Sequence, residues 1–255
     1  MTNLTEGAAF ARGGPVRRAL HVVFPPPARR RIWLWVTRGG PVADLYFWLD
    51  PRTRSRRVTR KTDIVIDGMA RSANSYAHVA FLLTNGESLN ISHHLHTPRV
   101  IERGVRFGIP TIVLIRDPRA VLASVIQYDK DGSAEQFLDA YLSYYRTVEP
   151  LLDRVVLADF TEVIADFGGV IDLCNAKFGT SFARYERTDE GEAAIVAKID
   201  EIMATVAAPE DLESKTPRPS ELRRSVDEVL ADLGPENQAA LAEAERLYAR
   251  LRPGA

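Results

Sequence analysis

A short loop of small and hydroxylated residues follows the first strongly apolar segment of the chain. It runs from Gly68 through Ser75, with the sequence GMARSANS, directly after the strand predicted at Ile64–Ile66. Where a strand turns into a helix, free backbone N–H groups and the positive end of the helix dipole form an anion site. Arg71 in this loop can donate two parallel N–H groups to phosphate oxygens, a geometry that lysine lacks. The loop therefore predicts phosphate binding.

The same loop departs from the nucleotide-binding pattern G-x-x-x-x-G-K-[ST]. Gly68 and Ser75 fit the pattern, but Ala73 replaces the second glycine and Asn74 replaces the lysine. An ATPase or kinase of the usual kind is disfavoured. Taken alone, the loop is also compatible with a solvated Arg71 and with Ser72 as an ordinary helix N-cap.

A second group of anion-binding candidates follows the apolar strand predicted at Thr111–Ile115. The chain continues as RDPRAVLAS from Arg116 to Ser124, in which Asp117 suits a helix N-cap and Pro118 suits the first helical turn. Open parallel sheets bind ligands beyond the carboxyl ends of their strands. Ser124 lies about two helical turns after Arg116 and can reach the same anion. Two anion sites at neighbouring strand ends imply a ligand that is phosphorylated at two places.

Three of the five histidines in the chain lie between these motifs, in the segment Ser92-His93-His94-Leu95-His96. Imidazole titrates near neutral pH and is a common general base. The alternatives are a metal cluster, for which the spacing offers no accompanying carboxylate, and ordinary surface or core histidines.

Three segments resemble the PAPS-dependent sulfotransferases, which use 3′-phosphoadenosine 5′-phosphosulfate (PAPS). IRDPRAVLAS resembles their 3′-phosphate motif, GMARSANSY resembles their 5′-phosphosulfate loop, and VVLADFTEVIADFGGVIDLCNAKFG resembles a later strand and helix. The loop departs from the family at Ala73 and Asn74, where Gly and Thr are usual. The resemblance extends from about Asp63 to Gly179.

The resemblance implies a role for each matching position. His94 stands where the family has its catalytic histidine, with His96 as the nearest substitute, and Arg116 and Ser124 match the 3′-phosphate ligands. Tyr76 occupies the position of an aromatic that stacks on adenine, although a half-buried helix tyrosine is an equal alternative. The positions that match the 5′-phosphosulfate loop are Arg71, Ser72, Ala73, Asn74 and Ser75.

The implied co-substrate is PAPS and the implied product is 3′-phosphoadenosine 5′-phosphate (PAP). No metal is implied, because no carboxylate follows the strands as magnesium binding would need, and Asp117 is better explained as a cap. Lys215 and Arg218 lie in the loop-like segment Pro209–Pro219 and are candidates to close over the nucleotide.

These residues need a scaffold, and the hydrophobic pattern predicts an α/β fold. We expect a three-layer αβα sandwich with a central parallel sheet, P-loop-like, and a helical C-terminal part. Besides the two strands above, strands are predicted near Leu89–Ser92 and at Arg154–Ala158. Helices are predicted at Ser72–Thr84, Pro118–Gln127, Ser133–Leu152, Thr161–Phe178, Asp189–Ala207 and Pro219–Leu251.

The chain divides into residues 1–60, a basic and aromatic N-terminal extension, and residues 61–255, the sulfotransferase-like domain. Residues 1–28 show no lasting periodicity and are predicted to be disordered. The apolar runs Ile32–Val36 and Leu45–Leu49 predict two short strands, or a strand and a helix. They either pack on the main domain or, beside the arginines, seat the protein on an anionic membrane or an acidic substrate.

Composition excludes several classes of protein. The chain has 33 Lys and Arg against 34 Asp and Glu, so no overall field indicates nucleic acid. Its single cysteine, Cys174, falls at a helical core position and can form no internal disulfide. Because no apolar run is long enough for a membrane span or a signal peptide, we expect a cytoplasmic protein, possibly membrane-associated.

The sequence thus predicts a sulfotransferase that acts on a hydroxyl or amine of a small-molecule, carbohydrate or lipid acceptor. One alternative is a P-loop kinase-like phosphotransferase, which would need Mg²⁺ and an aspartate to hold it. Another is a non-catalytic nucleotide-binding relative.

Overall fold

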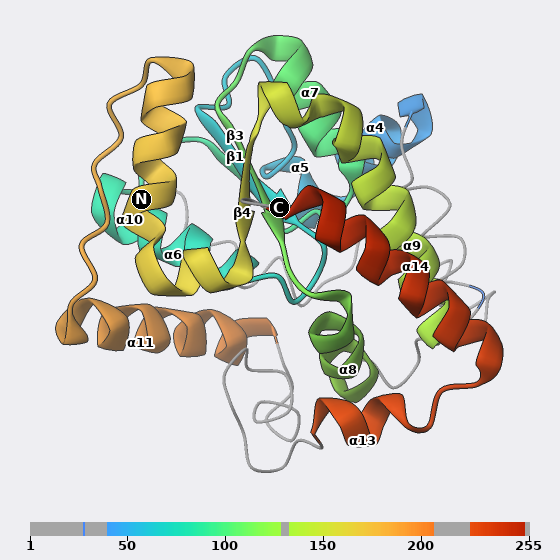
Figure 1. Ribbon diagram of the computed structural model, residues 1–255. Helices are drawn as coiled ribbons and strands as arrows, with labels where there is room; N and C mark the ends of the chain where they lie inside the picture. Colours follow the sequence, from blue (N-terminus) through green and yellow to red (C-terminus); the bar gives the residue numbers. More distant parts are fainter. Residues whose placement is uncertain (1–27, 29–39, 129–132, 207–224, 253–255) are drawn as a thin grey trace.

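The computed structural model describes residue 28 and residues 40–128, 133–206 and 225–252. A four-stranded parallel sheet forms its centre, and its order is β2-β1-β3-β4 (Figure 1). The strands are β1 (Ile64–Gly68), β2 (Ile91–His93), β3 (Thr111–Ile115) and β4 (Val156–Asp159). All residues of β1 and β3 are buried, which explains the continuous apolar runs Ile64–Ile66 and Ile112–Ile115 within them.

Helices cover both faces of the sheet, so the predicted α/β sandwich with a parallel sheet is confirmed. One layer consists of α6 (Asn74–Asn85), α10 (Phe160–Phe178) and α11 (Asp189–Val206). The other consists of α7 (Pro98–Phe107), α8 (Pro118–Tyr128), α9 (Ala134–Val148) and α14 (Pro235–Leu251). The remaining elements are α4 (Gly40–Leu49), α5 (Pro51–Arg54), the 3₁₀ helix η1 (Glu149–Arg154) and α13 (Val226–Leu230).

The chain reverses its direction of winding between β1 and β3. From β1 it passes through α6 to β2 on one side, and from β2 it passes through α7 to β3 on the other side of β1. The helices that follow β1 and β3 therefore lie on opposite faces, and the loops that lead into them diverge. Ligands of open α/β sheets bind at such a switch point.

Two predicted helices differ from the observed ones. Helix α7 was not predicted, although Thr97 caps it by accepting the Arg99 N–H at 3.3 Å, Pro98 occupies its first turn, and Gly108 ends it with a φ of 68°. The segment Pro219–Leu251 is helical as predicted over most of the part that the structure describes, but it is not continuous. Two helices, α13 and α14, lie there, because Pro235 begins a new helix.

Close backbone packing fixes the end of β1. A Cβ added to Gly68 would lie 2.1 Å from the carbonyl oxygen of Leu114 on β3, so only glycine fits where β1 turns into its loop. Cys174 is buried in the core as predicted, and burial raises the pKa of its thiol to about 12. Within the described residues no helix is long and apolar enough to span a membrane.

The N-terminal extension is described from residue 40 onward. Helix α4 contains the whole second aromatic run, Leu45–Leu49, so a helix rather than a strand forms there. Ile32–Val36 and the predicted disordered residues 1–28 lie almost wholly outside the described residues. Ala43, Phe47 and Val58 belong to the core cluster that includes α7 and α9. The domain boundary at residue 60 stays a prediction.

Candidate functional site

The loop after β1 is held in an uncommon backbone conformation. Arg71 has a φ of 71° and Ala73 a φ of 65°, values that favour glycine. Ala73, rather than Ser72, occupies the N-cap position of α6, and it makes no side-chain cap. Asn74 ties the loop to itself because its Nδ2 donates to the Met69 carbonyl oxygen at 2.9 Å. Ser72 and Asn74 are buried, so the loop offers an anion chiefly its backbone N–H groups and the Arg71 side chain.

The two predicted anion-binding motifs meet. The Nε of Arg71 donates to the Ser124 hydroxyl at 2.8 Å, and Nη1 of Arg116 donates to the backbone carbonyl of Arg71 at 2.9 Å. Their sequence separations are 53 and 45 residues, so only the fold brings them together. Because β1 and β3 are neighbours in the sheet, the loops that follow them share one edge. The geometry thus unites three of the predicted site residues.

Arg116 is positioned by residues that the sequence did not indicate. The centre of its guanidinium group lies 3.8 Å from the centroid of the Phe160 ring, at cation–π distance. The Tyr141 hydroxyl donates to the Arg116 carbonyl oxygen at 2.9 Å. The predicted cap role of Asp117 is seen as well, since its Oδ1 accepts the Arg119 N–H at 2.7 Å.

The histidine segment is held by Asp67, a buried carboxylate at the end of β1. Its oxygens accept the backbone N–H groups of Gly68 at 2.8 Å, Leu95 at 2.8 Å and His96 at 3.2 Å. His94 and His96 have φ values of 52° and 51°, so this segment is also in a strained conformation. Asp67 was missed by the sequence analysis, although an acidic residue at the end of an apolar strand, next to the phosphate loop, was a signal for it.

Both ring nitrogens of His94 have partners. Its Nε2 lies 3.0 Å from the Ser75 hydroxyl of the loop after β1, and its Nδ1 lies 2.8 Å from Nδ1 of His93. The structure therefore places the predicted base in contact with the predicted phosphosulfate loop. The His78 ring on α6 stacks on His93 with centroids 3.6 Å apart. His78 lies three residues after Ser75, one helical turn along α6. That spacing could have indicated from the sequence that His78 lies on the same side of α6 as Ser75.

The surroundings of this histidine cluster (His78, His93 and His94) favour the neutral form of each imidazole. Burial, with the neighbouring His96 and His78, holds the pKa of His94 well below its ordinary value. Burial, with the charge of Arg56, lowers the pKa of His78 to about 4. With these lowered pKa values, His78 and His94 are uncharged at neutral pH.

The same cluster is the candidate metal-binding group within the described residues. The planes of the His78 and His93 rings are only 10° from parallel, so their nitrogen lone pairs do not converge on one point. The Nδ1 atoms of His93 and His94 already share a hydrogen bond. The arrangement is that of stacked, hydrogen-bonded imidazoles.

His96 has a different environment. Its Nδ1 lies 2.8 Å from the Gly68 carbonyl oxygen, which can only accept, so Nδ1 carries the proton and donates. Its Nε2 is then the nitrogen that can take up a proton. His96 stays the second candidate for the base.

Tyr76 is linked to α11 rather than lying alone at the site. Its hydroxyl donates to Oε1 of Glu192 at 2.6 Å, and Tyr185 donates to the same oxygen at 2.9 Å. Burial and the Glu192 carboxylate raise the pKa of Tyr76 above its ordinary value. Its predicted contact with adenine stays a prediction, and Lys215 and Arg218 lie outside the described residues.

Comparisons with known proteins give one kind of match. No protein-family model matches the chain, and no curated protein sequence matches it. Among the solved structures that match is the mouse sulfotransferase SULT7A1 complexed with PAP. It is 12% identical, with a TM-score of 0.45, over 79% of this chain and 88% of that chain. The function has to be argued from the residues of the site itself.

Proposed function

We propose that this protein is a sulfotransferase that moves a sulfuryl group from PAPS to a hydroxyl or amine of a small-molecule, carbohydrate or lipid acceptor. The observation that carries the proposal is the hydrogen-bonded chain from Ser124 through Arg71 to Arg116. It joins the loop after β1 to the helix after β3, at the switch point of the sheet. A ligand with phosphate groups at two places matches two guanidinium groups in this position.

The donor would bind across this edge of the sheet. Arg71 and the backbone N–H groups of residues 72–75 would bind the 5′-phosphosulfate, at the N-terminus of α6. Arg116 and Ser124 would bind the 3′-phosphate, and Phe160 would hold the Arg116 guanidinium flat. Tyr76 would contact the adenine.

Transfer needs a base beside the sulfuryl group. The acceptor oxygen forms a bond to sulfur while the bond from sulfur to the 5′-phosphate oxygen breaks, and PAP leaves with the electron pair. Nε2 of His94 takes the acceptor proton. The Ser75 hydroxyl occupies Nε2 at 3.0 Å, so it would turn toward the phosphosulfate when the donor binds and leave that nitrogen open. Arg71 would stabilise the charge that develops on the leaving phosphate.

The proposed reaction uses no divalent metal. Magnesium in nucleotide sites is held by carboxylates together with phosphates. The carboxylate nearest the loop belongs to Asp67, which is fully buried and already accepts three backbone N–H groups. We therefore expect activity in the presence of a chelator.

Calorimetric binding of PAP without magnesium tests the donor site. We expect micromolar binding to the wild type and a loss of at least about tenfold in Arg116→Ala, since a hydrogen bond to a charged group contributes about 1.5–3 kcal/mol. Arg119→Ala is the matched control, because Arg119 pairs with Asp227 and Glu245 at the surface. Its PAP affinity should stay that of the wild type.

The same experiment decides between the candidate functions. Absence of PAP binding, or preference for magnesium-ATP, would reject the sulfotransferase and favour the kinase-like alternative. If PAP binds, His94→Gln should keep that binding and lose turnover with PAPS, whereas His96→Gln should retain most turnover. Equal activity of His94→Gln and wild type would assign the base elsewhere or identify a non-catalytic relative.

A further inference from the structure

Helix α4 is apolar except for Asp44, but it packs on one side only. Ala43 and Phe47 are in the core. The Asp44 carboxylate accepts N–H groups of Arg99 at 2.7 Å and of Arg103 at 3.0 Å, and these ion pairs hold α4 against α7. The opposite side exposes four large apolar residues, namely Val42 (48%), Leu45 (56%), Trp48 (45%) and Leu49 (49%). A helix that is apolar all round is expected to be buried on all sides.

A strongly basic segment borders this exposed side. Between Asp50 and Asp63 the chain has six basic residues and no acidic one. Arg54, Arg60 and Lys61 are exposed, and the Arg54 guanidinium lies 5.5 Å from the Trp48 ring. The Phe107 ring lies 5.1 Å from the guanidinium of Arg60 and 5.0 Å from that of Arg103, which also pairs with Asp44.

These contacts make α4 and the basic segment one continuous surface. We define the docking face as the exposed residues Val42, Leu45, Trp48, Leu49, Arg54, Arg60 and Lys61. Its apolar side chains come from one helix and its cations from the segment that follows. In Figure 1 α4 lies at the periphery of the molecule, away from the sheet.

We propose that the docking face seats the protein on an anionic membrane surface, with α4 lying in the plane of the headgroups. Exposed Trp and Leu side chains that lie beside basic residues are buried at the boundary between headgroups and acyl chains when a helix binds such an interface. Trp is favoured at the headgroup level, and nearby Lys and Arg are attracted to anionic lipids. The inference stands independently of the proposed reaction.

Charge selects this occupant over two others. A second copy that packed symmetrically through the same face would bring two basic surfaces together. The preceding 39 residues contain seven arginines and one glutamate, so packing them on the basic segment would also oppose like charges. An anionic bilayer attracts both segments. The first 61 residues hold 13 basic and 3 acidic residues, although the whole chain holds 33 and 34.

One residue of the basic segment also lies within electrostatic range of the candidate site. Arg56, in the basic segment, acts electrostatically on His78, His93 and His94. A protein seated by this face would hold the site near the membrane surface, where an acceptor with an apolar tail and a polar head is presented.

Vesicle co-sedimentation of the full chain tests the proposal. We expect binding to phosphatidylcholine vesicles with roughly one third phosphatidylglycerol, weak binding to pure phosphatidylcholine, and loss of binding as salt shortens the Debye length. Leu45→Ser with Trp48→Ser should weaken binding at least tenfold. Leu83→Ser with Leu173→Ser is the matched control, since these leucines are 48% and 61% exposed on α6 and α10.

A second pair of variants tests the cations. Arg60→Ser with Lys61→Ser should weaken binding by about fivefold per charge. The exposed residues Lys177 and Arg246 lie on α10 and α14, and replacing both with Ser should leave binding unchanged. Far-ultraviolet circular dichroism of every variant shows that the chain is folded, and PAP binding measured in parallel keeps this test separate from that of the proposed function.

Several outcomes would overturn the proposal. Equal binding to neutral and anionic vesicles would show that charge does not drive binding. Equal effects of the docking-face and control variants would show that the docking face is not the surface that binds lipid. A chain that dimerises in solution through Leu45 and Trp48, without lipid binding, would assign the face to a second copy. Lipid binding only after residues 1–39 are deleted would show that the chain covers its own face.

Discussion

Strained backbone conformations coincide with the candidate site at the scale of single residues. Within the described part of the chain, the non-glycine residues with positive φ are Arg71, Ala73, His94 and His96. Each costs on the order of 1–2 kcal/mol. Asp67 and Asn74 hold the two loops through hydrogen bonds to their backbones. Such strain clusters where side chains must be aimed at a ligand.

The histidine cluster leads to a prediction about stability and pH. Folding lowers the pKa of His78 from the ordinary value of 6.5 to about 4. Between these two pH values the unfolded chain therefore binds a proton at this residue that the folded chain does not bind. The stability contribution of a neutral His78 is therefore complete above about pH 6.5 and falls as the pH drops toward 4, by about 1.4 kcal/mol per pH unit. Urea unfolding of wild type and His78→Gln at several pH values measures it.

His78→Gln should show a shallower loss of stability between pH 6.5 and 4, because one buried imidazole is gone. His93 and His94 also have lowered pKa values and remain in the variant. Above pH 7 the two curves should run parallel. Parallel curves at acid pH as well would mean that His78 is not held neutral by the fold.

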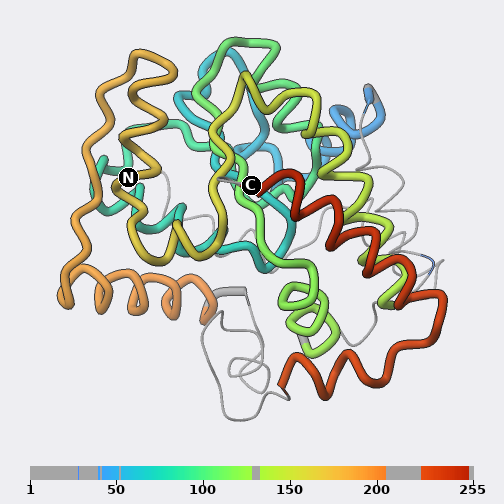
Figure 2. Tube along the Cα trace, viewed as in Figure 1, coloured from blue at the N-terminus to red at the C-terminus, as the bar shows by residue number. Residues whose placement is uncertain are grey.

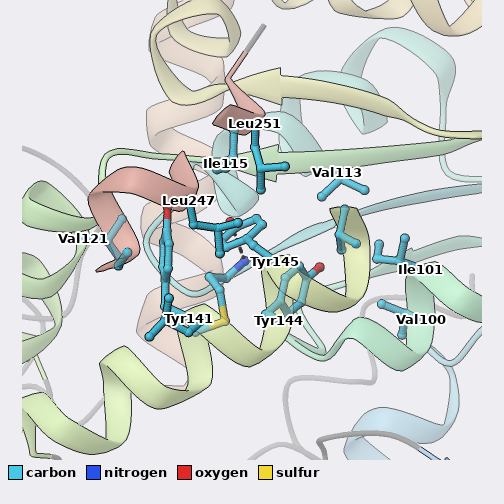
Figure 3. Close-up of a cluster of buried hydrophobic side chains, with 14 of the residues drawn as sticks. Val100, Ile101, Val113, Ile115, Val121, Tyr141, Tyr144, Tyr145, Leu247 and Leu251 are labelled. Atoms are coloured by element: carbon cyan, nitrogen blue, oxygen red, sulfur yellow. Dashed lines mark hydrogen bonds between the residues drawn. The ribbon is translucent and has the colours of Figure 1, made fainter. Parts of the chain in front are cut away.

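Helix α9 supports the site at the scale of elements. Tyr145 of this helix lies in the buried cluster drawn in Figure 3. Its hydroxyl donates to the Leu114 carbonyl of β3 at 2.7 Å and accepts the Met69 N–H at 3.4 Å. Tyr141, one turn earlier, donates to the carbonyl of Arg116. One helix therefore supports the loops that follow both β1 and β3.

Adjacent tyrosines on α9 give a matched pair of variants. Tyr145→Phe leaves the Leu114 carbonyl and the Met69 N–H without this partner, and we expect a loss of about 1–2 kcal/mol of stability. The Tyr144 hydroxyl is buried without a hydrogen-bond partner, so Tyr144→Phe should be neutral or stabilising. Urea denaturation distinguishes them, and equal losses in both variants would contradict this account.

The C-terminal helix belongs to the main core at the scale of the whole molecule. Figure 2 shows α14 running beside α9, and the two helices pack together with the sheet. Leu247 and Leu251 contribute to the same buried cluster as Tyr141 and Tyr145 (Figure 3). The Tyr248 hydroxyl donates to Oδ2 of Asp159, the N-cap of α10, at 2.6 Å. Helix α14 thus stabilises the N-terminus of α10, where Phe160 contacts Arg116.

Leu247→Ala should cost about 2–5 kcal/mol, because a buried leucine is lost and a cavity remains. Leu173→Ala, at 61% exposure, is the control and should change stability by less than about 0.5 kcal/mol. Chemical denaturation of both variants tests this. A small effect at Leu247 would mean that α14 is an appendage rather than part of the core.

The sequence by itself determined the parallel α/β architecture and the location of the two motifs that we predict to bind anions. Continuous apolar runs such as Thr111–Ile115 are typical of strands buried on both faces, and Asp117 with Pro118 marked a helix start. These signals come from residues that are neighbours in the sequence, so they can be identified without knowledge of the fold. Helix α7 was missed because its polar residues outweigh its narrow apolar face, although its caps were present in the sequence.

Tertiary structure alone decided which side chains meet. Three contacts at the site join residues that are distant in sequence. They are the hydrogen bond of Arg71 to Ser124, the Phe160 ring beside Arg116, and the hydrogen bonds of Asp67 to the histidine segment. Likewise, only the fold shows which side of α4 is buried. Strand order and the direction of each loop fix these contacts, and both depend on how the whole chain packs rather than on any local pattern.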